Sequence, residues 1–219
     1  MMNFTEWFLV AAEWIGTVAF AFSGAATAID RGLDIFGVLF MGLITAMGGG
    51  VIRDLLLGNV PPALFSNGEF VAASLITALA VFLLVCTTHH SPAKKGSAMH
   101  WTVNTADALG LGIFAVLGTQ VAIQAGYAHN PGMCIAMGAI TGCGGGALRD
   151  VLSREIPFVF TKHVYAVASI IGAALYFLLA QGLQVGVNTA AVIAVSMTLG
   201  IRLVAMINRW NLPKARYDD

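Results

Sequence analysis

Gly48-Gly49-Gly50-Val51-Ile52-Arg53-Asp54 is a motif that the chain contains twice, and the second copy reads Gly144-Gly145-Gly146-Ala147-Leu148-Arg149-Asp150. Each copy lies in a long apolar stretch and is followed by a proline, Pro61 or Pro157. Three glycines in a row cost a helix about 1 kcal/mol each relative to alanine. An Arg-Asp pair inside an apolar span is also costly and is by default a functional-site hypothesis. Because the chain contains both unfavourable features at matching places in its two halves, we expect the glycine triplets and the Arg-Asp pairs to have a function.

The composition identifies the class of protein around this motif. Of the 219 residues, 58% are hydrophobic and 10% are charged, and the mean hydropathy is +0.83. A soluble domain carries about 25% charged residues. The chain is therefore predicted to be an integral membrane protein, with apolar runs long enough for helices rather than barrel strands. The net charge of zero gives no indication of a nucleic-acid partner.

Seven membrane spans are expected, and each approaches or exceeds the roughly 20 residues that cross a bilayer. They cover approximately residues 8–29, 34–56, 66–88, 104–125, 131–153, 161–182 and 187–208. The longest connection, about 89–103, is polar. The fold class is thus all-α, as one membrane domain over 1–219 with a tail at 209–219.

The basic residues outside the spans predict the orientation. With seven spans, all eight fall on one side: Arg31, Lys94, Lys95, Arg154, Lys162, Arg209, Lys214 and Arg216. By the positive-inside rule, the amino terminus is outside and the carboxyl terminus is cytoplasmic. The amino terminus lacks a basic segment before its first apolar run, which indicates an anchor rather than a cleavable signal.

The repeat extends well beyond the motif. Residues Glu13, Gly16, Phe20 and Gly24 match Asp107, Gly110, Phe114 and Gly118 at an offset of 94, Gly42 and Thr45 match Gly138 and Thr141 at 96, and Ser74 and Ala78 match Ser169 and Ala173 at 95. Residues 8–88 and 104–184 are therefore two copies of a three-span unit, and the seventh helix at 187–208 stands alone. Because three is odd, the second copy starts on the opposite side. An inverted 3+3 repeat is typical of proteins that move solutes near the repeat interface.

The glycine triplets are expected near mid-membrane, as kinks in the middle helix of each repeat. A break frees backbone carbonyls, which are ligands for alkali cations, and such groups are tolerated only inside protein or beside water. The alternative interpretation is that the glycines only permit close helix packing. Arg53, Asp54, Arg149 and Asp150 are pore-charge or gating candidates, although each arginine could instead be structural and held by its neighbouring aspartate.

Other polar residues are weaker candidates for the pathway. Glu13 and Asp107 are expected either to cap their helices or to lie at the pathway mouths. Ser23, Thr27, Thr45, Thr119, Gln120 and Thr141 could line a path, although membrane hydroxyls more often bond their own backbone or a neighbouring helix. Arg202 is expected to snorkel to the cytoplasmic face, and His89, His90 and His100 to lie in a solvated loop. The sequence shows no catalytic constellation and no metal signature, so no enzyme activity and no cofactor are predicted.

The doubled motif, the two three-helix repeats and the seventh helix resemble the prokaryotic relatives of the trimeric intracellular cation (TRIC) channels. The resemblance implies a homotrimer in the plasma (inner) membrane of a prokaryote, in which each subunit holds its own pore. It also implies monovalent cation conduction, chiefly of potassium. Membrane lipids are further expected partners. The pore-lining candidates that it implies are the two triplets, Gly48, Gly49, Gly50, Gly144, Gly145 and Gly146, with Arg53 and Arg149 beside them.

Two functions follow from this pattern. The first is passive conduction of potassium and other monovalent cations such as sodium. The rival is secondary transport of a small amino acid such as glycine, because bacterial sequences of this type have also been classed as glycine transporters and inverted repeats favour transporters. A purely structural scaffold would leave the Arg-Asp pairs inside the membrane without a purpose. The chain also lacks the long charged carboxyl tail of the animal channels.

Overall fold

The computed structural model describes residues 3–88, 98–161 and 164–210. Within these ranges, the long helices are α1 (Phe4–Asp30), α2 (Ile35–Leu57), α3 (Gly68–Thr88), α4 (Ala98–Ala122), α5 (Pro131–Leu152), α7 (Tyr165–Phe177) and α8 (Val187–Ile207). Short π-helical segments, η2 (Ile123–Tyr127) and η3 (Leu178–Gly182), extend α4 and α7. The connections contain the 3-10 turn η1 (Ala63–Phe65) and the short helix α6 (Phe158–Thr161).

Seven of the helices in the described ranges are long and apolar enough to cross a membrane. Their positions confirm the seven predicted spans. The first begins at Phe4 and the sixth at Tyr165, a few residues from the expected starts at 8 and 161. Of the basic residues used to predict orientation, Lys94, Lys95, Lys162, Lys214 and Arg216 lie outside the described residues.

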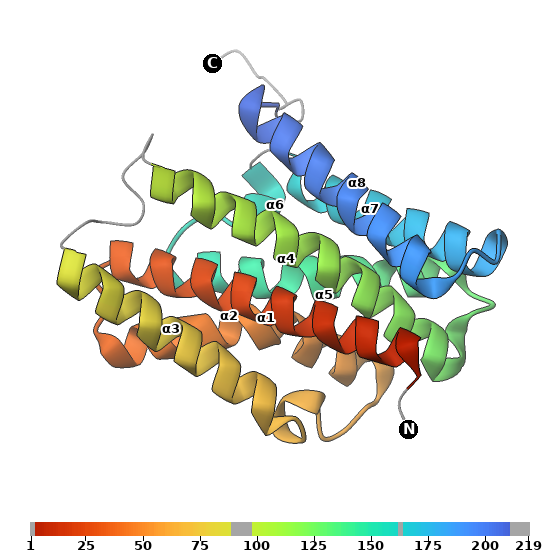
Figure 1. Cartoon of the computed structure of the whole chain (residues 1–219), viewed down its shortest axis with the longest axis horizontal. Coiled ribbons are helices and arrows are strands. Elements are labelled where there is room, and N and C mark those ends of the chain that lie inside the picture. The colour runs from red at the N-terminus through yellow and green to blue at the C-terminus, as the bar shows by residue number, and fades with distance from the viewer. Residues whose placement is uncertain (1–2, 89–97, 162–163, 211–219) are drawn as a thin grey trace, which may run out of the picture.

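Figure 1 shows how the two repeats are arranged. Helices α1, α2 and α3 pack on one another, and α4, α5 and α7 form a second group. The groups meet through α1 with α4 and through α2 with α5, while α8 packs on α4 and α7. In Figure 1, α1 runs from right to left and its counterpart α4 runs from left to right.

Equivalent glycines make equivalent contacts in the two groups. A Cβ atom on Gly16 would lie 3.1 Å from the ring of Phe114, and one on Gly110 would overlap the ring of Phe20. These four residues are the matched pairs of the sequence repeat, so each glycine of one copy accommodates the phenylalanine of the other. The Phe20 and Phe114 rings also stack, with centroids 5.2 Å apart.

The glycine triplets lie where α2 crosses α5, with the two backbones in contact. A Cβ atom on Gly49 would overlap the carbonyl oxygen of Thr141, and one on Gly145 would overlap that of Thr45. A Cβ atom on Gly144 would lie 2.9 Å from the Cα atom of Gly49. The triplets therefore permit an approach that no side chain would allow.

The expected release of backbone carbonyls at each triplet is not observed, whereas the expected kink of each helix there stays a prediction. Both α2 and α5 run without interruption through the glycines, so their backbone groups stay in the helical ladder. The physical reason is one of magnitude. Glycine costs a helix about 1 kcal/mol per residue, whereas each backbone group freed in a membrane interior costs several kcal/mol. The close crossing of α2 and α5 offsets the smaller cost.

Candidate functional site

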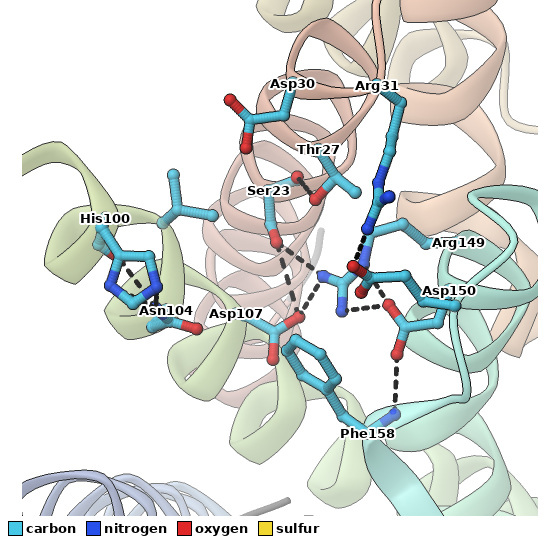
Figure 2. A pocket seen from close by; sticks show the side chains of 12 residues that line it. Ser23, Thr27, Asp30, Arg31, His100, Asn104, Asp107, Arg149, Asp150 and Phe158 are labelled. Carbon is cyan, nitrogen blue, oxygen red and sulfur yellow. Dashed lines mark hydrogen bonds and ion pairs between the residues drawn. The ribbon is translucent and has the colours of Figure 1, made fainter. Parts of the chain in front are cut away.

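Arg149 is the centre of a buried charged cluster at one end of the bundle. Its Nη1 donates to Asp107 Oδ1 on α4 at 2.6 Å and to Ser23 Oγ on α1 at 2.7 Å. Its Nε and Nη2 lie 2.9 and 2.8 Å from Asp150 Oδ1. The Arg149 side chain is 3% exposed. Figure 2 shows the guanidinium between the two carboxylates, with helices from both repeats contributing.

Asp150 also holds the segment that follows α5 through a hydrogen bond to its backbone. Its Oδ2 accepts a hydrogen bond of 2.8 Å from the backbone N–H of Phe158, the first residue of α6. The returning chain carries the Phe158 ring to within 5.4 Å of the Arg149 guanidinium, where cation-π attraction applies. The Arg-Asp motif and the start of α6 thus form one local unit that holds the arginine.

A pocket of about 210 Å³ leads to this cluster. Arg149, Asp107, Asp150 and Phe158 line its inner part. Ser23 lies beside them, and the rest of the lining is formed by Thr27, Asp30, Arg31, His100, Val103, Asn104 and Glu155. An ion pair between Arg31 and Glu155 joins the end of α1 to the segment after α5. The pocket therefore carries charged and polar side chains at both of its ends and lies between the two repeats.

The first repeat holds a simpler version of the same arrangement. Arg53 Nη2 and Nε lie 2.7 and 2.9 Å from Asp54 Oδ1, and Asp54 Oδ2 accepts from the Ala63 N–H at 2.9 Å. Glu13 is the counterpart of Asp107, but within the described residues Arg53 forms its ion pair with Asp54 and none with Glu13. The Arg53 side chain is 12% exposed. The two motifs thus fold alike, while only the second gathers carboxylates from two helices.

The third glycine of each triplet faces the arginine of its own motif. A Cβ atom on Gly50 would lie 3.7 Å from Arg53 Nη2, and one on Gly146 would lie 3.8 Å from Arg149 Nη2. Gly146 also makes room for the Tyr165 hydroxyl, which would lie 2.7 Å from that Cβ. The glycines of each triplet therefore have two roles. The third lies beside the arginine of its motif, and the first two lie at or near the α2–α5 crossing.

The hydroxyl candidates separate into two sets. Ser23 and Thr27 line the pocket. Thr45, Thr119 and Thr141 lie away from it, are buried, and donate to carbonyls of their own helices at Met41, Ala115 and Met137. Gln120 accepts from the Tyr176 hydroxyl at 2.7 Å and thereby ties α4 to α7.

Three expectations about charged or capping residues are corrected by the structure. Glu13 does not cap α1, because that helix begins at Phe4 with Asn3 as its cap. Asp107 does not cap α4, because that helix begins at Ala98. Arg202 does not snorkel, because it is 1% exposed inside the bundle. Of the histidines expected in a solvated loop, His100 instead lies in α4 and lines the pocket, while His89 and His90 lie outside the described residues.

Sequence reasoning missed Tyr165 and Phe158 and misplaced Arg202. Tyr165 is 2% exposed, and its ring lies 4.6 Å from the Arg202 guanidinium and meets Phe158 edge-on at 6.5 Å. One signal was available. At the offset of 95, Tyr165 corresponds to Phe70, so a hydroxyl appears in one repeat where the other has none.

Comparison with known proteins places this fold. A family model described as Glycine transporter matches residues 10–85 and 104–181. The UPF0126 inner membrane protein YadS of Escherichia coli K12 is 36% identical over 198 residues, 90% of either chain. The UPF0126 membrane protein YvgT of Bacillus subtilis is 33% identical, covering 93% of this chain and 94% of that protein.

Solved structures match over nearly the whole chain. One is a TRIC cation channel from work on the structural basis for conductance, with a TM-score of 0.83, 36% identity, and coverage of 96% of this chain and 98% of that one. Another is the TRIC trimeric intracellular cation channel orthologue from Rhodobacter sphaeroides, with a TM-score of 0.80, 30% identity, and coverage of 91% and 97%.

The fold and these matches define an all-α membrane protein with seven candidate transmembrane helices and a repeated three-helix unit. The chain belongs to the prokaryotic TRIC channel family, which includes the UPF0126 proteins. It is a homologue of prokaryotic TRIC cation channels.

Proposed function

We propose that the protein is a monovalent cation channel of the inner membrane, conducting chiefly potassium, with one path in each subunit of a homotrimer. The observation that carries this proposal is the match to solved TRIC cation channels over 91 to 96% of the chain. In the proposed topology the amino terminus is outside, and the end of the bundle that holds Arg31 and Arg154 is cytoplasmic, in keeping with the positive-inside rule.

The proposed path runs between the two halves of an inverted repeat. The opposite directions of α1 and α4 in Figure 1 and the reciprocal Gly16–Phe114 and Gly110–Phe20 contacts support a pseudo-two-fold relation between the halves. The pocket between α1, α4 and α5 is the cytoplasmic section of the path. Of the triplet glycines, we assign Gly50 and Gly146, which face the two arginines, to the lining of the whole path.

In this proposal the Arg149 cluster closes the path. Its guanidinium fills the inner end of the pocket and is bound by Asp107, Asp150 and Ser23. A cation that enters from the cytoplasm meets the Arg149 guanidinium before it reaches the glycines, and the two carboxylates that could bind the cation are already paired with Arg149. Conduction therefore requires Arg149 to withdraw from Asp107, so that the carboxylate faces the path.

The rival function is secondary transport of glycine or a similar zwitterion. The description of the matching family model favours it. The pocket also presents both a guanidinium and carboxylates, which are the groups that would bind the two ends of an amino acid. Inverted repeats with a site between the halves are frequent in transporters.

Recording from the purified protein in planar bilayers separates these functions. We expect unitary currents in potassium chloride with a reversal potential that follows the potassium gradient. Glycine uptake into proteoliposomes of the same preparation is expected to match that of protein-free vesicles. Saturable, coupled glycine uptake without unitary currents would identify a transporter. Native mass measurement in mild detergent tests the assembly, and a monomer or dimer alone would contradict the homotrimer.

A further inference from the structure

Arg202 brings a second cation to the Arg149 cluster from outside the repeat. It lies on α8, which has no counterpart in the first repeat. Its Nη2 is 4.0 Å from Asp107 Oδ2, and its side chain is 1% exposed. Asp107 is thus shared. Its Oδ1 accepts from Arg149 at 2.6 Å, while its Oδ2 faces Arg202 and has no hydrogen-bond partner among the described residues. With Asp150, the cluster holds two positive and two negative charges.

Arg202 is also held by contacts that lie outside α5. Its guanidinium stacks on the Tyr165 ring of α7 at 4.6 Å, and α8 packs on both α7 and α4. Asp107 itself belongs to α4. A movement of Arg149 or of α5 can therefore leave the Arg202–Asp107 pair in place.

We propose that Arg202 is a positioning residue for opening, which keeps Asp107 paired when Arg149 withdraws from it. This inference rests on the proposed function. An unpaired carboxylate inside a membrane protein is strongly unfavourable, so the withdrawal of Arg149 would be resisted if Asp107 had no other cation. Arg202 removes that resistance. It also weakens the hold of Asp107 on Arg149, because the carboxylate divides its interaction between two guanidinium groups.

The first repeat supports this assignment by contrast. It has Phe70 in place of Tyr165, α8 packs mainly on α4 and α7 of the second repeat, and Glu13 forms no ion pair with Arg53 within the described residues. In the part of the chain that the structure describes, no carboxylate from another helix holds the first arginine, so a second cation is not required there. The extra arginine occurs at the end of the bundle where an arginine is bound by a carboxylate from another helix.

The test is a double-mutant cycle on open probability in planar bilayers. We expect Arg202→Gln to lower open probability about fivefold or more, the low end of couplings between distinct sites. Arg202→Lys keeps the charge and is expected to retain most of the open probability. In an Asp107→Asn background the carboxylate is absent, so adding Arg202→Gln is expected to change open probability less than about twofold. Arg154→Gln is the matched control, because it removes an exposed positive charge from the same end of the bundle and is expected to behave like the parent.

The possible results distinguish a failure of the Arg202 inference from a failure of the channel function. Parent currents that R202Q leaves unchanged would overturn this inference and leave the channel function intact, whereas a parent without unitary currents would overturn the channel function itself. An R202Q effect that persists in the D107N background would show that Arg202 does not act through Asp107. If the R202Q single variant does not assemble, the D107N/R202Q double variant tests whether Arg202 acts through Asp107. Assembly with the open probability of D107N supports the proposal, and failure of this double variant to assemble shows a merely structural arginine.

Discussion

Gly49 lies so close to the carbonyl oxygen of Thr141 that a Cβ atom has no room between them, and Gly145 has the same relation to Thr45. The obstructing atom is backbone in both cases, so no side-chain rotation can relieve the overlap. At Gly50 the nearest atom to an added Cβ is Arg53 Nη2, at 3.7 Å. Of two adjacent glycines in one triplet, Gly49 therefore has no space for a side chain, whereas Gly50 has space for a methyl group.

Alanine substitutions should separate these glycines by the sign of their effect. Alanine adds about 1 kcal/mol of helix propensity at any of the sites. At Gly49 or Gly145 this gain is outweighed by overpacking, which typically costs about 1–3 kcal/mol and more against rigid backbone. We expect Gly49→Ala and Gly145→Ala to lower the thermal unfolding midpoint in detergent, and Gly50→Ala to leave it unchanged or raise it. Equal midpoints for Gly49→Ala and Gly50→Ala would show that the triplet is not a packing device.

The two arginines of the repeated motif should differ in their contribution to stability. Removing one partner of a buried ion pair costs about 3–5 kcal/mol, because the other charge is left uncompensated. Arg149→Gln leaves the Asp150 carboxylate without its cation and removes the ion-pair partner of Asp107 Oδ1. Arg53 binds Asp54 alone within the described residues and is four times as exposed, at 12% against 3%. We expect Arg149→Gln to reduce the detergent unfolding midpoint more than Arg53→Gln does. The reverse order would contradict the burial of the second cluster.

Much of this architecture follows from the sequence. The seven spans are apolar runs of the right length, and the repeat is visible in the matched residues of both copies. The glycine triplets are different, because a run of glycines is compatible with a break or with a close crossing. Only the facing carbonyls of Thr45 and Thr141 decide between them, and those lie about one hundred residues away in the chain.

The charged cluster was predictable only in part. The Arg149–Asp150 pair is adjacent in sequence, and Asp107 stood out as the repeat partner of Glu13. The pairing of Asp107 with Arg149 and Arg202 depends on how α4 and α8 rotate within the bundle. Membrane helices that are apolar on nearly all sides do not encode that rotation in a hydrophobic stripe. Arg202 therefore looked like a residue that reaches for the membrane surface.

The orientation can be tested with introduced cysteines. His129 lies between α4 and α5 and Arg154 follows α5, and both are exposed. Because the basic residues indicate the cytoplasmic side, a membrane-impermeant maleimide added outside intact cells should label His129→Cys but not Arg154→Cys. The background should carry Cys86→Ser, since Cys86 is the exposed native cysteine, while Cys134 and Cys143 are buried. Labelling of Arg154→Cys alone would invert the proposed topology.

The pocket should be the water-filled entrance from the cytoplasm. Thr27 lines it and is half-buried, whereas Thr119 is fully buried where Gly138 packs against it. A small positively charged methanethiosulfonate added to the cytoplasmic face should react with Thr27→Cys and reduce the unitary potassium current, because a fixed positive charge in a narrow path repels cations. The same reagent should leave Thr119→Cys channels unchanged, and Cys86→Ser should again be the background. Modification of Thr27→Cys that goes to completion without altering the current would place the conducting path away from this pocket.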